Sequence, residues 1–333
     1  MRYKLLDMPW NIDEQCEMLP FPFVEWSWLI QYRVGYKPVR PDLGRLLKWV
    51  PYYEDGYYDA ALLHIDLDST DQSRDSSARH QVYKELNTVI NGIPKIVIVH
   101  GRRLDVNEHP VQEVRDLLGG NLVMVSSEAV ADRLGLGYVI PPGINAENWI
   151  DLPKEPRIVT SIDQATILDL QIIESLGNEL AARDIMLCRI GADYVPNTWL
   201  DYRDFLGRSL IYFAHSSCSE RMKAEAMLSG CCVLAHSAAE QATIDGYTTA
   251  GQLIVAPEPG KMVELVEELI VNPAKAMRVG QKAKVMARHL YDWDCYSQAW
   301  LKYLNLHVWK NQSGSLALKT FGGAPMSVPQ EFV

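Results

Sequence analysis

Apolar and polar positions follow two patterns along the chain, one typical of buried strands and the other of amphipathic helices. Continuous apolar runs between polar or turn residues predict strands, and apolar positions at three- and four-residue spacing predict helices. In the first half, the predicted strands cover 2–7, 59–66, 93–101, 121–127 and 138–145. The predicted helices there cover 75–91 and 110–119, with a short one after residue 127. Between the first two strands, where Trp and Tyr are mixed with Pro, we expect irregular or short helical segments.

The same alternation restarts near residue 157. The predicted strands of this second half cover 157–162, 185–191, 209–217, 231–237 and 252–257. The predicted helices cover 167–184, 219–230 and 262–273, and a last helix carries Trp293, Tyr296, Trp300 and Tyr303. Strands that alternate with helices form parallel sheets with helices on both faces. We therefore expect two α/β halves that join within residues 144–156.

Composition places the chain among ordinary globular proteins. Of its 333 residues, 48% are hydrophobic and 22% are charged, which excludes a disordered chain, a collagen-like fibre and a coiled coil. No apolar run approaches the roughly 18 residues that a membrane-spanning helix needs. The first residues, MRYKLLDMPWNIDEQ, contain charges and a proline where a signal peptide has an apolar run. We therefore expect a cytoplasmic protein without a membrane span.

Charge and cysteine spacing narrow the choice of partners. The 32 basic and 42 acidic residues give a net charge of −10, which argues against a general nucleic-acid coat but is compatible with a local basic patch. The six cysteines have no C-x-x-C spacing, so we expect neither a structural zinc site nor a disulfide scaffold. Cys231 and Cys232 lie in an apolar run and are interpreted as buried thiols in a reducing compartment.

Two segments contain ordered motifs. The first, VSSEAVADRLGLGYVIPPGINAENW, covers 125–149. The second runs from SLIYFAHSSCSERMKAEAMLSG, which starts at residue 209, to YDWDCYSQAW, and it includes Glu225 followed by Ala-Met-Leu-Ser-Gly. Over roughly residues 90–305, the order of these motifs resembles the family-four retaining glycosyltransferases, whereas the first 90 residues match that family poorly.

This resemblance implies the B-type glycosyltransferase fold, in which two Rossmann-like domains face each other across a cleft. Residues 1–146 would form an acceptor-binding domain and residues 147–290 a nucleotide-sugar-binding domain. A helix at 291–309 would cross back toward the N-terminal domain, and residues 310–333 would form a flexible tail or a strap on the surface. The implied reaction transfers a hexosyl or pentosyl group to a hydroxyl with retention at the anomeric carbon. The nucleotide-sugar is a co-substrate, and no metal or other cofactor is expected.

The donor site implied by the resemblance centres on the helix that Ser219 is expected to cap. Unpaired N–H groups and a partial positive charge at a helix start suit the phosphates of a nucleotide-sugar. Glu225, further along this helix, would accept both ribose hydroxyls, as the family's second glutamate does. Outside this motif, a solvated helix glutamate would be the favoured interpretation. Glu220, Arg221 and Lys223 near the helix start are further donor-side candidates.

Two familiar parts of such a donor site are missing. The family's first glutamate lies eight residues before the second, and Ser217 occupies that position here. The family's Arg and Lys, which hold the diphosphate, would fall in Ile162-Asp-Gln-Ala-Thr166, which contains no cation. Another cation must then neutralise the leaving phosphate, and Arg189, Arg221 and Lys223 are the candidates, although each also fits an ordinary surface residue.

Candidate sugar and acceptor contacts lie in the first half. His100 follows the apolar run IPKIVIV, and the resemblance implies that it contacts the donor sugar; capping of the strand end is the alternative. His64 ends another strand and fits either acceptor binding or, slightly better, packing. Trp10 lies in MPWNIDEQ, which replaces the family's glycine-rich loop, so we expect the acceptor side to diverge.

A segment rich in basic and aromatic residues leaves the chemical identity of the acceptor undecided. Arg33 and Lys37 lie in sequence close to Trp26, Trp28 and further cations, and cations beside aromatic rings hold phosphates and stack bases. A solvated loop over a small aromatic core is the favoured interpretation, and a DNA contact is the alternative.

Three functions therefore remain. The first is a retaining transferase that acts on a saccharide or other small hydroxyl acceptor, and the second is a phage-type DNA glycosyltransferase that acts on a hydroxymethylated base. The third is a nucleotide-sugar-binding protein with impaired chemistry, which would fit Ser217 and the missing cations. A dehydrogenase is disfavoured, because neither half has G-x-G-x-x-G after its first strand.

Overall fold

The computed structural model describes residues 2–8, 21–28, 33–34, 37–38, 57–66, 93–100, 121–124, 138–162, 165–215, 218–236, 254–256 and 259–309. These residues form two compact units. The first takes its residues from Met1–Gly143 and Tyr296–Pro325, and the second from Ile144–Cys295. The predicted helices at 75–91, at 110–119 and after residue 127, and the predicted tail, lie outside the described residues.

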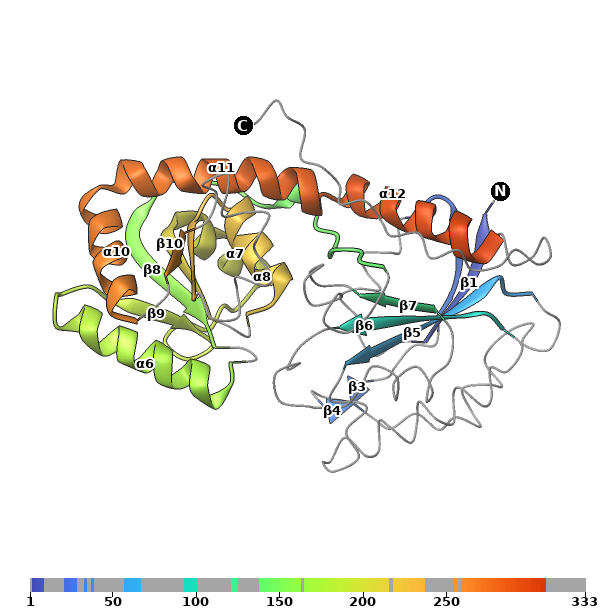
Figure 1. Ribbon diagram of the computed structural model, residues 1–333, viewed down its shortest axis with the longest axis horizontal. Coiled ribbons are helices and arrows are strands. Elements are labelled where there is room, and N and C mark those ends of the chain that lie inside the picture. The colour runs from blue at the N-terminus through green and yellow to red at the C-terminus, as the bar shows by residue number, and fades with distance from the viewer. Residues whose placement is uncertain are drawn as a thin grey trace. The chain divides into compact units, whose positions relative to one another are not determined.

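The first unit contains a parallel sheet of five strands in the order β2-β1-β5-β6-β7 (Figure 1). Its strands are β1 (Tyr3–Met8), β2 (Val24–Trp28), β5 (Ala60–Asp66), β6 (Lys95–His100) and β7 (Asn121–Met124). Leu5, Leu62 and Ile98 are fully buried, as expected for strands of a sheet whose side chains form the core. Four of the predicted strands are thereby confirmed. The strand β2 and the short antiparallel pair β3 (Arg33–Val34) and β4 (Lys37–Pro38) were not predicted.

The predicted strand at 138–145 is wrong. Residues 138–145 form no strand, and Ile144 makes only an isolated bridge to Asp292, with its N–H donating to the carbonyl of Tyr291 at 2.7 Å. Pro141 and Pro142 have no N–H to donate, so a ladder cannot continue through them.

The second unit contains a second parallel sheet, in the order β12-β11-β10-β8-β9. Its strands are β8 (Glu155–Ser161), β9 (Leu187–Ile190), β10 (Ser209–Ala214), β11 (Cys232–His236) and β12 (Ile254–Ala256). All five correspond to predicted strands. The short 3-10 helix Ala146–Asn148 precedes them in the chain.

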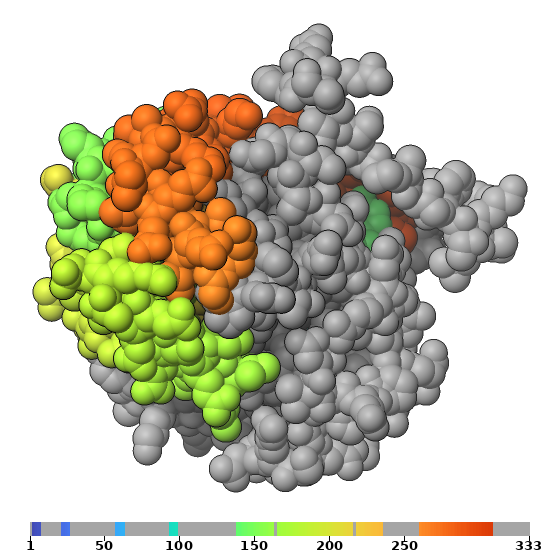
Figure 2. Space-filling view, turned by 60° about the vertical axis from the view of Figure 1, so that its left-hand side comes forward, coloured from blue at the N-terminus to red at the C-terminus, as the bar shows by residue number. Residues whose placement is uncertain are grey.

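Helices cover both faces of the second sheet, as the alternating pattern predicts. Their bounds are α6 (Ile167–Ala181), α7 (Trp199–Arg208), α8 (Glu220–Leu228), α10 (Pro259–Val271) and α11 (Pro273–Tyr291). One core cluster joins the sheet to α6 and α10, and the other joins it to α7, α8 and α11. Figure 2 shows the outer surfaces of α6 (yellow-green) and α10 (orange) side by side. Neither α7 nor α11 was predicted.

The last helix, α12 (Trp293–Leu304), is followed by a π-helical turn at Asn305–Trp309. From Tyr296 on, the chain packs within the first unit. The ring centroid of Tyr296 lies 5.5 Å from that of Phe21, and the hydroxyl of Tyr3 donates to Asn305 Oδ1 at 2.6 Å. A Cβ on Gly143 would lie 2.3 Å from the ring of Tyr296, so this close approach requires glycine. The first unit is therefore built from both ends of the chain.

Candidate functional site

Two helices of the second unit begin at the carboxyl edge of its sheet. Helix α6 follows β8, and α8 follows β10, so both N-termini lie at the edge where parallel α/β proteins bind ligands. Thr166 and Asp169 form a reciprocal capping box at the start of α6. Ser219 caps α8 as predicted, with its hydroxyl accepting the N–H of Met222 at 3.1 Å. Two partial positive charges thus face the same edge of the sheet.

The carboxylate of Glu225, in α8, accepts hydrogen bonds from two side chains. Its Oε2 accepts the hydroxyl of Tyr202, from α7, at 3.2 Å, and its Oε1 accepts Nε of Arg221 at 2.9 Å. Burial, followed by the charge of Glu225, raises the pKa of Tyr202 well above its ordinary value, so the hydroxyl remains a donor at neutral pH. A carboxylate has about four acceptor positions, and Tyr202 and Arg221 occupy two of those on Glu225.

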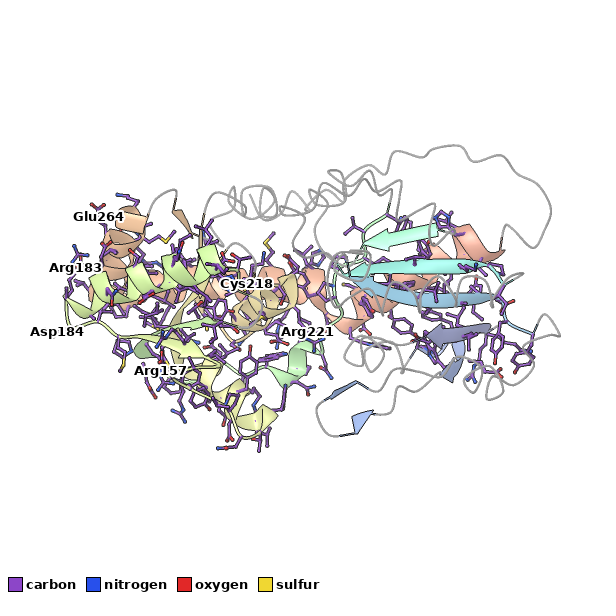
Figure 3. The ribbon with its side chains drawn as sticks, turned by 90° about the horizontal axis from the view of Figure 1, so that it is seen from below. Arg157, Arg183, Asp184, Cys218, Arg221 and Glu264 are labelled. Carbon is purple, nitrogen blue, oxygen red and sulfur yellow. The ribbon has the colours of Figure 1, made fainter. Side chains whose placement is uncertain are left out.

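Glu220 and Lys223 form a second pair on the same helix. Lys223 Nζ lies 3.1 Å from Glu220 Oε2, and the two side chains are only 6% and 11% exposed. The hydroxyl of Tyr291, at the end of α11, donates to the other oxygen of Glu220. The predicted cation Lys223 is therefore neutralised within the protein. Arg221 is more open, at 38% exposed, and Figure 3 shows it with Cys218 at the start of α8.

Arg189 lies apart from α8, on the edge strand β9, with β8 between it and β10. Its Nε and Nη2 donate to the two oxygens of Asp193 at 2.8 and 2.7 Å. These bonds lower the pKa of Asp193 to about 2, so the pair is charged at neutral pH. Each of the three predicted cations thus already has a carboxylate partner.

The remaining predicted residues belong to the first unit or lie outside the described part of the chain. His64 and His100 are on the neighbouring strands β5 and β6, near their carboxyl ends, and Arg33 and Lys37 start β3 and β4. The structure describes the backbone of these four residues and not their side chains. Ser217 and Trp10 lie outside the described residues.

A buried histidine and a buried aspartate at the same edge were not identified from the sequence. His215 directly follows β10 and is 1% exposed, and its Nδ1 lies 3.6 Å from Oδ2 of the fully buried Asp169. Asp169 is the N3 residue of the α6 capping box, and its Oδ2 accepts the N–H and the hydroxyl of Thr166 at 2.9 and 2.7 Å. Neither ring nitrogen of His215 has a hydrogen-bond partner in the part of the chain that the structure describes.

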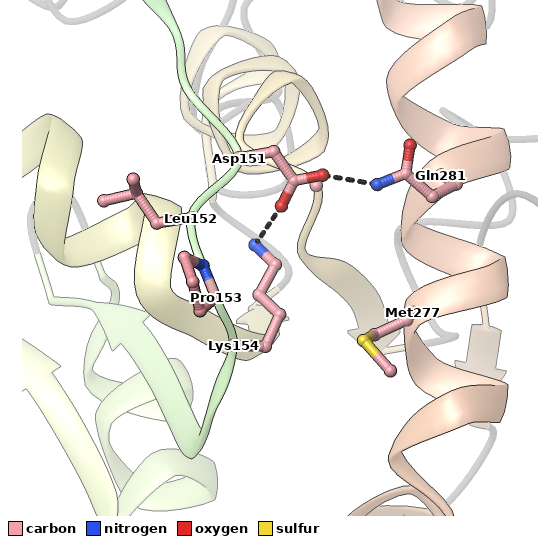
Figure 4. A pocket seen from close by; sticks show the side chains of 7 residues that line it. Asp151, Leu152, Pro153, Lys154, Met277 and Gln281 are labelled. Carbon is pink, nitrogen blue, oxygen red and sulfur yellow. Dashed lines mark hydrogen bonds and ion pairs between the residues drawn. The ribbon is translucent and has the colours of Figure 1, made fainter.

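A pocket of about 360 Å³ lies at the amino end of β8, away from this edge (Figure 4). Lys154 and Asp151 line it, with Gly230, Met277 and Gln281 among the other residues. Lys154 Nζ donates to the carbonyls of Gly207 and Ser229 at 2.9 and 2.6 Å, which end α7 and α8, and it lies 3.2 Å from Asp151 Oδ1. Because the ammonium of Lys154 already has these partners, we interpret it as a structural link between the ends of α7 and α8.

Two properties of the described residues bear on the expected functions. Among the described residues, no group of three or more His, Cys, Asp or Glu side chains is arranged to hold a metal ion. No helix within the described ranges is both long and apolar enough to cross a membrane.

No protein-family model matches the sequence, and no curated protein gives a significant match. Solved structures do match in fold. Sucrose-phosphate synthase from Thermosynechococcus elongatus has a TM-score of 0.62 at 13% identity, covering 94% of this chain and 100% of that chain. HepE of Anabaena, in complex with UDP and glucose, has a TM-score of 0.59 at 13% identity, covering 92% and 100%. A glycosyltransferase from Rickettsia africae has a TM-score of 0.55 at 13% identity, covering 93% and 99%.

At 13% sequence identity, the similarity to these structures establishes a shared fold. The structure has two parallel α/β sheets, each in its own unit, and it shares this fold with these enzymes. The chain has the B-type glycosyltransferase fold of two Rossmann-like domains.

Proposed function

We propose that this protein is a glycosyltransferase that moves a hexosyl or pentosyl group from a nucleotide-sugar to a hydroxyl of a saccharide or other small acceptor, with retention at the anomeric carbon. The fold supports this proposal, because similarly folded HepE has been solved in complex with UDP and with UDP-glucose. The observation that carries it is the arrangement of Glu225, fixed by Tyr202 and Arg221 within a capped helix at the carboxyl edge of the second sheet.

The proposed donor site belongs to the second unit. The amide groups at the start of α8 would bind the diphosphate, as helix N-termini commonly do. Glu225 would accept the two ribose hydroxyls, since a carboxylate accepts several hydrogen bonds. The buried pair of Glu220 and Lys223 would support the helix start. The first unit, with His100, His64 and Trp10 as candidates, would bind the acceptor and the transferred sugar.

The proposed reaction breaks the bond between the anomeric carbon and the diphosphate oxygen. The acceptor oxygen forms the new bond on the same face of the sugar, and its proton ends on the leaving diphosphate. Negative charge grows on that diphosphate in an oxocarbenium-like transition state, so the main catalytic requirement is to stabilise it with fixed dipoles and cations.

Nucleotide binding tests the donor site. Titration calorimetry with uridine, UDP, guanosine and GDP should show micromolar to millimolar binding of one nucleoside diphosphate to the wild type. Glu225→Gln should weaken that binding at least about tenfold, because the amide accepts at a single oxygen. Glu264→Gln is a matched control, because Glu264 is 66% exposed on α10 and pairs with Lys261. Equal affinities in the wild type and Glu225→Gln would contradict the proposed donor site.

Turnover tests the chemistry and the acceptor. Release of nucleoside diphosphate is measured with a panel of nucleotide-sugars, with saccharides and with DNA containing hydroxymethylcytosine as acceptors. Proton NMR of the product reports whether the anomeric configuration is retained. Product of inverted configuration would overturn the retaining mechanism, and nucleotide-sugar binding without turnover on any acceptor would favour the binding-protein alternative.

A further inference from the structure

We propose that His215, oriented by Asp169, is the donor-binding residue that contacts the diphosphate, in place of the cations missing between β8 and α6. This inference rests on the proposed function, because it names the protein group that faces the leaving phosphate. Arg189, Arg221 and Lys223 are the candidates for that role in the sequence, and each of them is paired with a carboxylate of this chain.

The position of His215 places it at the start of two helices. It is the residue after β10, the middle strand of the sheet, and it precedes the α8 cap Ser219 by four positions. In β10, Phe213 joins the core cluster on the side of α6, whereas Tyr212 and Ala214 join the cluster on the side of α8. The alternation of side chains along a strand puts His215 on the α6 side, which agrees with its contact with Asp169.

The imidazole ring of His215 is a buried polar group that a ligand could satisfy. It is 1% exposed, and neither nitrogen has a hydrogen-bond partner within the described residues. A buried polar group without a partner destabilises a fold, and an apolar side chain of similar size would avoid that cost. Violations of this kind occur at functional sites more often than in ordinary cores.

Asp169 is arranged to orient this ring. The N–H and the hydroxyl of Thr166 fix Oδ2 of Asp169, which lies 3.6 Å from Nδ1 of His215. A small shift of the ring would close this gap to a hydrogen bond, with Nδ1–H donating to the carboxylate. Nε2 of the ring would then be left for a hydrogen bond to a phosphate oxygen. Asp169 is therefore a positioning residue, and His215 is the one that touches the ligand.

Comparison of a nucleoside with its diphosphate isolates this role. Calorimetry with uridine and with UDP is carried out on the wild type, His215→Leu, His215→Gln and Glu225→Gln, and guanosine with GDP serves equally should the wild type prefer them. We expect His215→Leu to weaken UDP binding at least about tenfold while leaving uridine binding unchanged. His215→Gln, which keeps an N–H donor, should recover part of the loss. Glu225→Gln should weaken uridine and UDP together.

Thermal unfolding of the same variants separates a ligand contact from a structural role. His215→Leu should unfold at the wild-type temperature or above it, because it removes a buried polar group without a partner. A lower unfolding temperature together with parallel losses of uridine and UDP binding would show a structural role and overturn the inference. Unchanged UDP affinity in a folded His215→Leu would also overturn it, and the proposed function would stand. A wild type that binds neither uridine nor UDP, nor their guanosine counterparts, would instead refute the proposed function.

Discussion

Tyr202 and Glu225 lie on different helices, 23 residues apart, and the hydroxyl of Tyr202 donates to the carboxylate of Glu225 at 3.2 Å. This bond joins α7 to α8 and sets the position of the carboxylate in the proposed donor site. Tyr202 is partly buried, so removing its hydroxyl takes away a donor that holds the carboxylate of Glu225.

The first prediction concerns this hydroxyl. Tyr202→Phe should weaken nucleoside binding several-fold and lower the free energy of unfolding by about 1.5–3 kcal/mol, the usual range for a hydrogen bond to a charged group. Calorimetry with uridine and urea unfolding measure the two effects. Tyr194→Phe is the matched control: its hydroxyl donates to the backbone carbonyl of Asp201 at 3.2 Å, so nucleoside binding should be unchanged. Full uridine affinity in Tyr202→Phe would show that the bond does not position Glu225.

The second prediction is a loss of stability at alkaline pH. Burial raises the pKa of Tyr202 and of Tyr212 well above the ordinary value of 10.0, with charge from Glu225 and Cys218 adding to it respectively. Above about pH 10 the unfolded chain loses these protons while the folded chain keeps them, so the free energy of unfolding falls as pH rises. Each tyrosine contributes up to about 1.4 kcal/mol per pH unit until its folded pKa is reached.

Urea unfolding followed by circular dichroism between about pH 9 and pH 11 measures this loss. Tyr212→Phe removes one of the two groups, so its free energy of unfolding should fall less steeply over that range. An equal slope in the variant and the wild type would show that Tyr212 ionises as easily in the folded chain as in the unfolded one.

The third prediction contrasts two helix glycines. A Cβ on Gly280, in α11, would lie 2.3 Å from the carbonyl oxygen of Gly230, whereas a Cβ on Gly177, in α6, would meet nothing nearer than Leu187 at 3.9 Å. Alanine is the better helix former by about 1 kcal/mol. Gly177→Ala should therefore stabilise the protein by up to about 1 kcal/mol, and Gly280→Ala should destabilise it by about 1–3 kcal/mol through overpacking. Thermal unfolding gives the sign of each change in stability. If both substitutions stabilise the protein, the close packing of α11 is refuted.

The fourth prediction concerns Lys154, which links the ends of α7 and α8. Lys154→Met removes the ammonium that binds the carbonyls of Gly207 and Ser229 and the carboxylate of Asp151, from a side chain that is 6% exposed. We expect a loss of about 2–4 kcal/mol in the free energy of unfolding, because these buried acceptors lose their donor. Lys261→Met, at a pair that is more than half exposed, should leave the urea midpoint close to that of the wild type. Similar urea midpoints for the two variants would contradict a structural role for Lys154.

Apart from β2, the strands of the two five-stranded sheets were predictable because their apolar runs are continuous. Helix α11 was missed because its buried face is made of small residues, Ala276, Gly280, Ala283 and Ala287, which give no strong apolar period. The strand β2 was missed because Val24-Glu-Trp-Ser-Trp28 lies at the edge of its sheet, where the polar residues Glu25 and Ser27 interrupt the apolar run.

The candidate site was predictable only where its residues are close together in sequence. Ser219 and Glu225 are on one helix and belong to one motif, so the pattern identified both. Asp169 and His215 are 46 residues apart and meet only because β8 and β10 are neighbouring strands. The pairing of Lys223 with Glu220 depends on burial, which the spacing of the charges does not reveal.

The return of the chain at Tyr296 affects the order in which the protein can fold during synthesis. A ribosome completes Tyr3, Phe21 and Tyr138 early, but their partners Asn305, Tyr296 and Tyr303 are made only after the whole second unit. Domains generally fold as units as they are translated, so the second unit can complete its folding before the first unit does. Until then, the aromatic side chains of the nascent first unit remain uncovered, which makes that intermediate a natural client for chaperones.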